Sequence, residues 1–306
     1  MVIDFHCHIT TPGSRMPDPD GHYYRPIVPI SPATNLLGTW AHDAVDTIAE
    51  RWRTAQALKT YRSLGPFIYT EMSRRMTVTD ASTLLGEMAA NGINQAVVVA
   101  IDPLVPTMEI LQACSRLHGV LFPFGSVDPH TTDYLDRFDA VLDMPIAGLK
   151  FHSDLQNLPI DSPRMAALME RLSRSEHVDV PVYLHTGNFP IYRPLDSPWE
   201  RALPQLVRSF PEIKFICGHS GWDNPKAALK AALACPNLYL ETSWQPPQLI
   251  RRLCDKLGPE RLIFGSDFPL YSQARALKNV KIALTPEEFD LVTYHNAHNL
   301  LRKTAD

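Results

Sequence analysis

Val2-Ile3-Asp4-Phe5-His6-Cys7-His8 opens the chain with the alternation of apolar and polar side chains that is typical of a β-strand. Successive side chains of a strand point to opposite faces, so His6 and His8 share one face and Asp4 lies below them. Along a strand the two imidazoles lie about 7 Å apart, near enough to converge on one ion. On its own this pair is weak evidence, because two histidines on a polar strand need no metal.

Four further segments repeat the pattern of an apolar run that ends in a ligand-type side chain beside Gly, Ser or Pro. The four terminal residues are His152, His185, His219 and Asp267. Such an ending indicates a strand that gives way to a loop. Lys150 shares the face of His152 in the run from residue 147 to 152. A single such residue is more simply a satisfied core histidine, but its repetition on five strands favours a metal site at their C-terminal ends.

Strand and helix patterns alternate from residue 79 onward, and helical periodicity separates consecutive strands. The strands are expected to start near residues 2, 96, 120, 147, 181, 213, 238 and 261. The first helix is expected over Thr79–Asn91, with Thr79 or Asp80 as its N-cap and Gly92 as its stop. Eight such units predict a closed (β/α)₈ TIM barrel, an α/β fold, that forms a single domain over residues 1–306.

The first connection departs from this regular pattern. Residues 9–78 form an insertion of some seventy residues after the first strand, where a βα loop usually has two to six. The segment from Asp43 to Leu64 has a helical pattern. The insertion is a lid over the pocket, or a subunit contact or packing element against the barrel wall, and one segment can serve both purposes. If it is a lid, some of His22, Tyr24, Arg25, Arg51 and Trp52 should border the pocket. We take Arg51 as a substrate-binding residue because a guanidinium pairs bidentately with a carboxylate.

Composition excludes several classes of protein. The net charge of −4 provides no basic face for nucleic acid. There is no apolar run long enough to cross a membrane, and the first eight residues already form a strand, which leaves no room for a signal peptide. The five cysteines are odd in number and form no C-x-x-C motif, so we expect reduced thiols and a cytoplasmic protein. The dinucleotide and P-loop motifs are missing.

The motifs together resemble the amidohydrolase superfamily, and within it the branch of aminocarboxymuconate-semialdehyde decarboxylase and related metal-dependent hydrolases. The matching stretches are Asp4-Phe5-His6-Cys7-His8, Leu184-His185-Thr186-Gly187, Cys217-Gly218-His219-Ser220-Gly221, Gly265-Ser266-Asp267-Phe268-Pro269 and Asn296-Ala297. The resemblance implies that His6, His8 and His185 are metal ligands and that Asp267 is a ligand and catalytic carboxylate. It also implies that His219 orients or deprotonates a water or the substrate.

Lys150 and His152 are expected to bind substrate, but three roles remain open for the lysine. As an ammonium it would grip a substrate carboxylate, which is the role we favour. By resemblance to binuclear members of the superfamily, it would instead be carboxylated and bridge two metals. In the third role it forms a structural ion pair with a nearby acid.

Three imidazoles and a carboxylate suit one divalent ion, first of all Zn²⁺, with Mn²⁺ or another divalent metal as alternatives. A water held there falls in pKa from 15.7 to about 7 and becomes a nucleophile. We therefore expect a metal-dependent hydrolase of a small carboxylate-, amide- or lactone-bearing substrate. The first alternative is a non-oxidative decarboxylase of an aromatic or muconate-type acid, and the second is an inactive barrel that serves as a binding module. The expected partners are a small-molecule substrate and further copies of the chain in a homodimer or larger homo-oligomer.

Overall fold

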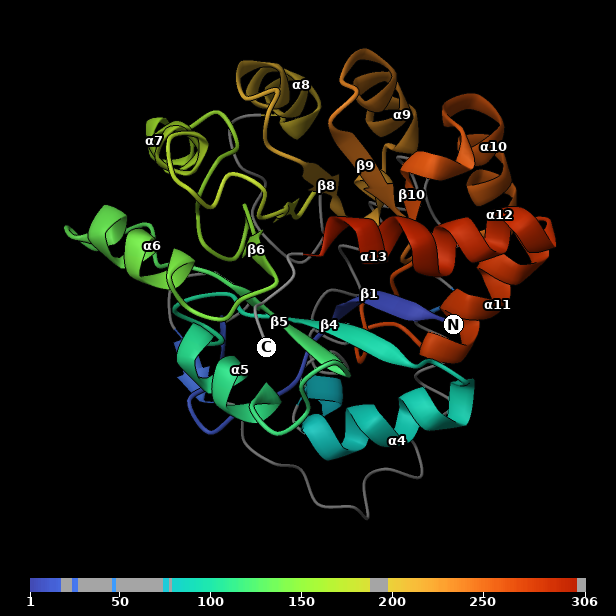
Figure 1. Ribbon diagram of the computed structural model, residues 1–306, viewed down its shortest axis with the longest axis horizontal. Coiled ribbons are helices and arrows are strands. Elements are labelled where there is room, and N and C mark those ends of the chain that lie inside the picture. Colours follow the sequence, from blue (N-terminus) through green and yellow to red (C-terminus); the bar gives the residue numbers. More distant parts are fainter. Residues whose placement is uncertain (18–23, 27–45, 48–73, 77–78, 188–197, 302–306) are drawn as a thin grey trace.

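The computed structural model arranges eight parallel strands in a ring with helices on its outside (Figure 1). The structure describes residues 1–17, 24–26, 46–47, 74–76, 79–187 and 198–301. Neighbours in the ring are neighbours in the chain, in the order β1 (Ile3–Cys7), β4 (Gln95–Val99), β5 (Leu121–Gly125), β6 (Gly148–Phe151), β7 (Val182–Leu184), β8 (Phe215–Cys217), β9 (Leu238–Glu241) and β10 (Leu262–Ile263). The predicted TIM barrel is confirmed, with every strand within two residues of its expected start.

A helix follows each strand and covers the outside of the sheet. These helices are α4 (Ala81–Asn91), α5 (Thr107–Cys114), α6 (Tyr134–Leu142), α7 (Pro163–Ser173), α8 (Trp199–Ser209), α9 (Pro225–Ala234), α10 (Pro247–Leu257) and α11 (Gln273–Ala283). The chain closes with α12 (Pro286–Asp290), a π-helical turn (Leu291–His295) and α13 (Asn296–Leu300). Within the described ranges no helix is long and apolar enough to cross a membrane.

The first of these helices shows how local sequence sets the boundaries. The Asp80 side chain accepts a hydrogen bond of 2.8 Å from the backbone N–H of Thr83, which satisfies one of the free donors at the helix start. Gly92 ends the helix in the left-handed region, at φ 68°, where a Cβ would be strained. Gly92 was predicted for its position, and Asp80 was one of the two predicted N-cap candidates.

The barrel is filled and closed at its N-terminal end by apolar side chains. Phe5, Val97, Phe124 and Ile216 point into the ring from four strands and are fully buried. Leu300 of α13 joins the same interior cluster, and α13 crosses the middle of the ring in Figure 1. One end of the barrel is therefore plugged by packing, which leaves the other end for a site.

The ring is closed by contacts between β1 and the segment that follows β10. Phe5 N–H donates to the carbonyl of Phe264 at 3.0 Å, and Asp267 N–H donates to the carbonyl of His6 at 2.8 Å. Beneath them the buried Asp4 carboxylate accepts from both the backbone N–H and the hydroxyl of Ser266, at 2.8 and 2.5 Å. The first and last strands are thus held in register by a side chain as well as by backbone.

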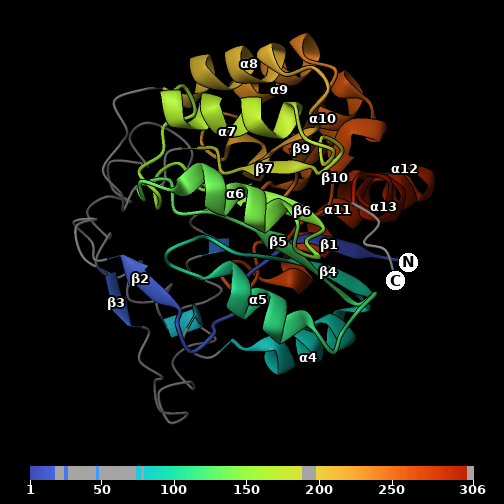
Figure 2. The same cartoon turned by 60° about the vertical axis from the view of Figure 1, so that its left-hand side comes forward.

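Part of the insertion after β1 forms a small antiparallel hairpin of β2 (Arg15–Pro17) and β3 (Tyr24–Pro26). Figure 2 shows the hairpin at the end of the barrel opposite the N-terminus. The predicted helix from Asp43 to Leu64 lies outside the described residues except for Asp46 and Thr47. Arg51, His22 and Trp52 also lie outside them, and of Tyr24 and Arg25 only the backbone is described, so the lid and the interface both remain predictions.

Helices α10 and α12 are joined by an ion pair that gives a prediction for acid stability. Arg251 contacts both carboxylate oxygens of Glu288, at 2.5 and 2.9 Å, and the same carboxylate accepts from the N-cap Thr285 N–H. These hydrogen bonds lower the pKa of Glu288 from 4.5 to about 2. Because the folded-state pKa is depressed, the stabilisation is present above pH 4.5 and is lost as the pH falls toward 2.

We expect Glu288→Gln to remove about 1–2 kcal/mol of unfolding free energy at neutral pH, a figure reduced for solvent screening. The deficit should shrink as the pH falls below 4.5, where the wild type loses the same contribution. Urea unfolding at several pH values measures this, with Glu287→Gln, an exposed acid in the same turn, as the control. Equal pH dependence of the two variants would contradict the assignment.

Candidate metal centre and active site

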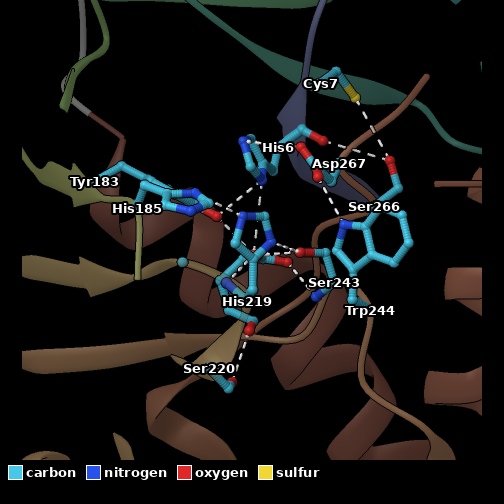
Figure 3. Close-up of polar contacts among 12 residues, drawn as sticks. His6, Cys7, Tyr183, His185, His219, Ser220, Ser243, Trp244, Ser266 and Asp267 are labelled. Carbon is cyan, nitrogen blue, oxygen red and sulfur yellow. Dashed lines mark hydrogen bonds and ion pairs between the residues drawn. The ribbon is translucent and has the colours of Figure 1, made fainter. Parts of the chain in front are cut away.

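The predicted ligand-type side chains meet in one pocket at the C-terminal ends of the barrel strands. The cavity encloses about 580 Å³, open solvent at its mouth included. Its polar lining includes His6, His8, Lys150, His152, His185, Thr186, His219 and Asp267. Figure 3 shows His6, His185, His219 and Asp267 pointing toward a common centre. Every sequence-predicted site residue that the structure describes is therefore part of one site.

Two of these residues are held in an unusual backbone conformation. His219 has φ 54° and Asp267 has φ 67°, in the left-handed region that non-glycine residues seldom adopt. Hydrogen bonds hold both: the His219 N–H donates to the Glu241 carboxylate at 2.9 Å, and the Asp267 N–H donates to the His6 carbonyl. These turns direct each side chain back over the barrel mouth, and such strain is typical of functional sites.

The Asp267 carboxylate lies at the centre of the site. Its Oδ1 is 3.0 Å from His8 Nε2 and 3.4 Å from His6 Nε2, while its Oδ2 accepts a hydrogen bond of 2.7 Å from the Trp244 indole N–H. Burial raises the pKa of Asp267, but the two histidines and the indole donor outweigh it, so the net shift of the pKa is downward. Asp267 is therefore ionised, and its Oδ1 is the carboxylate oxygen on the side of the pocket histidines.

The imidazoles and the carboxylate together have the character of a metal site. His6, His219 and Asp267 each offer an atom within 4.8 Å of the others, and His152, Asp154 and His185 form a second such group. Burial lowers the pKa of His6, His152, His185 and His219 well below the usual value, which leaves neutral rings with a lone pair for a cation. Nitrogen and carboxylate oxygen ligands suit a borderline divalent ion.

Contacts between His185 and His219 separate their roles. His219 Nδ1 lies 2.6 Å from the Ser243 hydroxyl and its Nε2 lies 3.1 Å from His185 Nδ1, so both of its nitrogens have a protein partner. His185 Nε2 is buried without a hydrogen-bond partner within the described part of the chain. An orphaned, buried nitrogen of this kind fits a metal ligand, which places His185 ahead of His219 for that role.

Lys150 is a fully buried amine on the floor of the pocket. Its Nζ lies 3.1 Å from His6 Nε2 and 3.8 Å from the centroid of the Tyr183 ring. Burial lowers the pKa of Lys150 to about 7, although Asp267 and Glu241 oppose the shift. None of the ion pairs among described residues includes it. Lys150 therefore has no carboxylate within the described residues with which to form a structural ion pair, which was one of the three roles considered for it.

A family model for amidohydrolases matches residues 3–303, nearly the whole chain. The chain belongs to the amidohydrolase family. This confirms the resemblance seen in the strand-end motifs. Among curated proteins no match is found.

Solved structures share the fold of this amidohydrolase at low sequence identity. An uncharacterised TIM-barrel protein from Bordetella bronchiseptica has a TM-score of 0.70 and 16% identity, and the alignment covers 98% of this chain and 97% of that one. A 5-carboxyvanillate decarboxylase from Sphingomonas paucimobilis has a TM-score of 0.64 and 15% identity, with 98% of both chains covered. A dihydroxybenzoic acid decarboxylase from Polaromonas sp., solved with manganese and 2-nitroresorcinol, has a TM-score of 0.59 and 16% identity, with 81% and 93% covered.

His152 of this amidohydrolase lies beside His185. Among the described residues, it forms no ion pair with Asp267. Its ring stacks on His185 with centroids 3.6 Å apart, and its Nδ1 accepts a hydrogen bond of 3.2 Å from Leu155 N–H. An accepting Nδ1 leaves the proton of the neutral ring on Nε2. His152 can therefore donate to a substrate in the pocket.

Four buried residues that touch the site were missed in the sequence: Tyr183, Glu241, Ser243 and Trp244. Glu241 carried a readable signal, because it ends the apolar run Leu238-Tyr239-Leu240 as the histidines end theirs. Tyr183 lies inside an apolar strand, and the other two belong to the loop after β9, where no periodicity marks them.

Proposed function

We propose that this amidohydrolase is a metal-dependent hydrolase of a small, planar ester, lactone or amide that carries a carboxylate. The observation that supports it is Lys150, a buried amine that lines the pocket without an ion-pair partner among the residues described. A buried cation is costly unless it is paired, and a substrate carboxylate would complete the pair.

The proposed metal ligands are His6, His8, His185 and Asp267. Support comes from the two imidazoles gathered on Asp267 Oδ1 and from the orphaned Nε2 of His185. A divalent ion bound there would supply a Lewis acid for a substrate oxygen. We assign one ion, and leave His152 to donate from Nε2 to the substrate.

The protein's own groups account for orientation and proton transfer. Lys150 fixes the substrate by its carboxylate, and His152 donates to a second polar atom. Asp267 Oδ1 and His219 are the groups that can take a proton from an attacking water and return it to the leaving group. The apolar part of the pocket wall is formed by Ile101, Leu155, Trp222, Trp244 and Leu270.

Lys150 also bears on which reaction occurs. In hydrolysis the substrate carboxylate is a bystander, so a strong ion pair to it positions the substrate without opposing the reaction. In decarboxylation an ion pair to the departing carboxylate would stabilise the ground state and slow the step. This argument favours hydrolysis.

Decarboxylation of an aromatic acid is the second candidate. It is supported by the apolar walls, which suit the release of uncharged CO₂, and by the activities in the names of the two decarboxylases of the same fold. In that reaction the carbon–carboxylate bond breaks, the ring carbon takes up a proton, and Lys150 would hold a phenolate oxygen instead.

The test is product analysis with zinc- or manganese-loaded protein. Cyclic lactones that bear a carboxylate and hydroxybenzoic acids are offered in parallel, and ring opening and CO₂ release are both measured. Ring opening without CO₂ supports hydrolysis, and CO₂ release supports the second candidate. Bound metal with no turnover of either class would point to a binding module.

Lys150→Met should raise KM for a carboxylate substrate about 100-fold, the cost of a charge-assisted contact of 2–3 kcal/mol. KM for the methyl ester of the same substrate should hardly change, because the ester has no negative charge for Lys150 to bind. One metal per chain should remain; loss of a second metal from the variant would instead indicate a carboxylated, bridging lysine. Lys230→Met, an exposed lysine of α9, is the control for a change in net charge.

A further inference from the structure

Glu241, the last residue of β9, forms a buried hub beneath the site. It is fully buried, and its carboxylate makes four hydrogen bonds. Oε2 accepts from the Tyr183 hydroxyl at 2.7 Å, from the Ser243 hydroxyl at 2.8 Å and from the backbone N–H of His219 at 2.9 Å, while Oε1 accepts from the backbone N–H of Ser243. Two of these donors, the hydroxyls, also touch histidines of the site.

The first branch runs through Tyr183 to His6. The Tyr183 oxygen lies 2.9 Å from His6 Nδ1, but its single proton is already donated to Glu241. The tyrosine oxygen can therefore only accept from the ring, so the proton of the neutral His6 is on Nδ1. The Lys150 amine, 3.1 Å from His6 Nε2, can donate to that nitrogen and is compatible with this tautomer.

The second branch runs through Ser243 to His219, and the position of the ring proton follows from the hydrogen bonds in the same way. The Ser243 proton is donated to Glu241, so the serine oxygen accepts from His219 Nδ1 at 2.6 Å. His219 Nε2 then has a lone pair and accepts from His185 Nδ1 at 3.1 Å. This puts the lone pair of His185 on Nε2, the buried atom that has no hydrogen-bond partner among the described residues and lies 3.7 Å from Asp154 Oδ2. Figure 3 shows Ser243, His219 and His185 in sequence.

Two glycines of the sequence motifs make room for this network. A Cβ on Gly218 would lie 2.8 Å from the Tyr183 hydroxyl oxygen and 2.6 Å from a ring carbon of the same residue. A Cβ on Gly265 would lie 2.5 Å from Glu241 Oε1. Real side chains do not approach so closely, so the strands on both sides must carry glycine for the tyrosine and the carboxylate to meet.

We propose that Glu241 is a positioning residue that fixes the tautomer of three histidines, acting on His6 through Tyr183 and on His219 and His185 through Ser243. Each ring is held with its proton on Nδ1 and its lone pair on Nε2, the nitrogen that faces the pocket. Without the network, His6 would favour a proton on Nε2, where Asp267 Oδ1 lies 3.4 Å away to accept it. A protonated Nε2 cannot bind a cation.

The inference rests on the proposed metal site for its purpose, but its central test needs neither metal nor substrate. Full-length protein labelled with ¹⁵N-histidine is stripped of metal by a chelator, and long-range ¹H–¹⁵N NMR reports which ring nitrogen carries the proton. Tyr183→Phe should change the tautomer of His6 and spare His219. Ser243→Ala should change His219 and His185 and spare His6. Glu241→Gln should change all three.

Affinity for Zn²⁺ is the second readout, measured by competition with a chromophoric chelator. Each variant should bind Zn²⁺ about 10- to 100-fold more weakly, the usual cost of losing an outer hydrogen bond to a ligand. Thermal unfolding identifies variants that have merely lost structure, because such damage does not exchange one tautomer for the other at a chosen ring.

Wild-type His6 with its proton on Nε2 would overturn the proposal, as would unchanged tautomers in both the Tyr183→Phe and Ser243→Ala proteins. If the wild type shows the expected tautomers but binds no zinc, the proposed metal site is wrong and the proposed hydrogen-bond network is still supported. The failure of this inference and the failure of the proposed function are therefore distinguishable.

Discussion

Replacement of His6 and His8 together by alanine is expected to abolish both metal binding and turnover while the barrel stays folded. Both imidazoles contact Asp267 Oδ1, at 3.4 and 3.0 Å, so the double variant would remove both of these histidine partners of the carboxylate. Two of the four proposed ligands would be lost. Activity should fall to background, a larger effect than for any single substitution considered above.

The measurement is metal content per chain after reconstitution with zinc, together with circular dichroism to show that the fold persists. His295→Ala with His298→Ala provides the matched control, because it also removes two histidines, both exposed, near the opposite end of the barrel. Undiminished zinc in the His6 and His8 double variant would show that the metal site lies elsewhere.

His219→Ala is expected to lower kcat by about 10² to 10⁴, the range for loss of a positioned acid–base group. Zinc stoichiometry at saturating metal should hardly change. The reason lies in its contacts: Ser243 and His185 already occupy its two nitrogens, so His219 stands beside the ligands and has no nitrogen free for the ion.

This second prediction separates two descriptions of the site. Distance alone groups His219 with His6 and Asp267 as ligands, whereas the hydrogen bonds favour His185. If His219→Ala loses its metal as completely as the double variant does, the grouping by distance is correct. A fall in kcat with full metal occupancy supports the acid–base role.

The fold and the position of the site were predictable because strand endings are a local signal. A buried parallel strand reads as an apolar run, and a parallel barrel brings the ends of all its strands to one face. His185 after Val182–Leu184 and Asp267 after β10 are found in this way from sequence alone. The same rule applies to Glu241, which ends the apolar run of β9.

Contacts made by loops were not predictable in this way. Trp244 reaches Asp267 from the turn after β9, at a φ of 63° that no sequence pattern announces. Tyr183 alternates with apolar neighbours and looks like core, and only the three-dimensional packing shows its hydroxyl between His6 and Glu241. Which nitrogen of a ring carries its proton likewise depends on partners from other strands.

The closure of the ring between β1 and the segment after β10 has a consequence for how the protein is made. His8 and Asp267 are 259 residues apart in the sequence. During synthesis, His6 and His8 therefore leave the ribosome long before Asp267 has been added to the chain. At 5–20 residues per second this interval lasts roughly 13 to 50 s. During that time the imidazoles would meet only weak, incomplete coordination. Metal capture would therefore come last, and would mark the chains in which the final strand has reached the first.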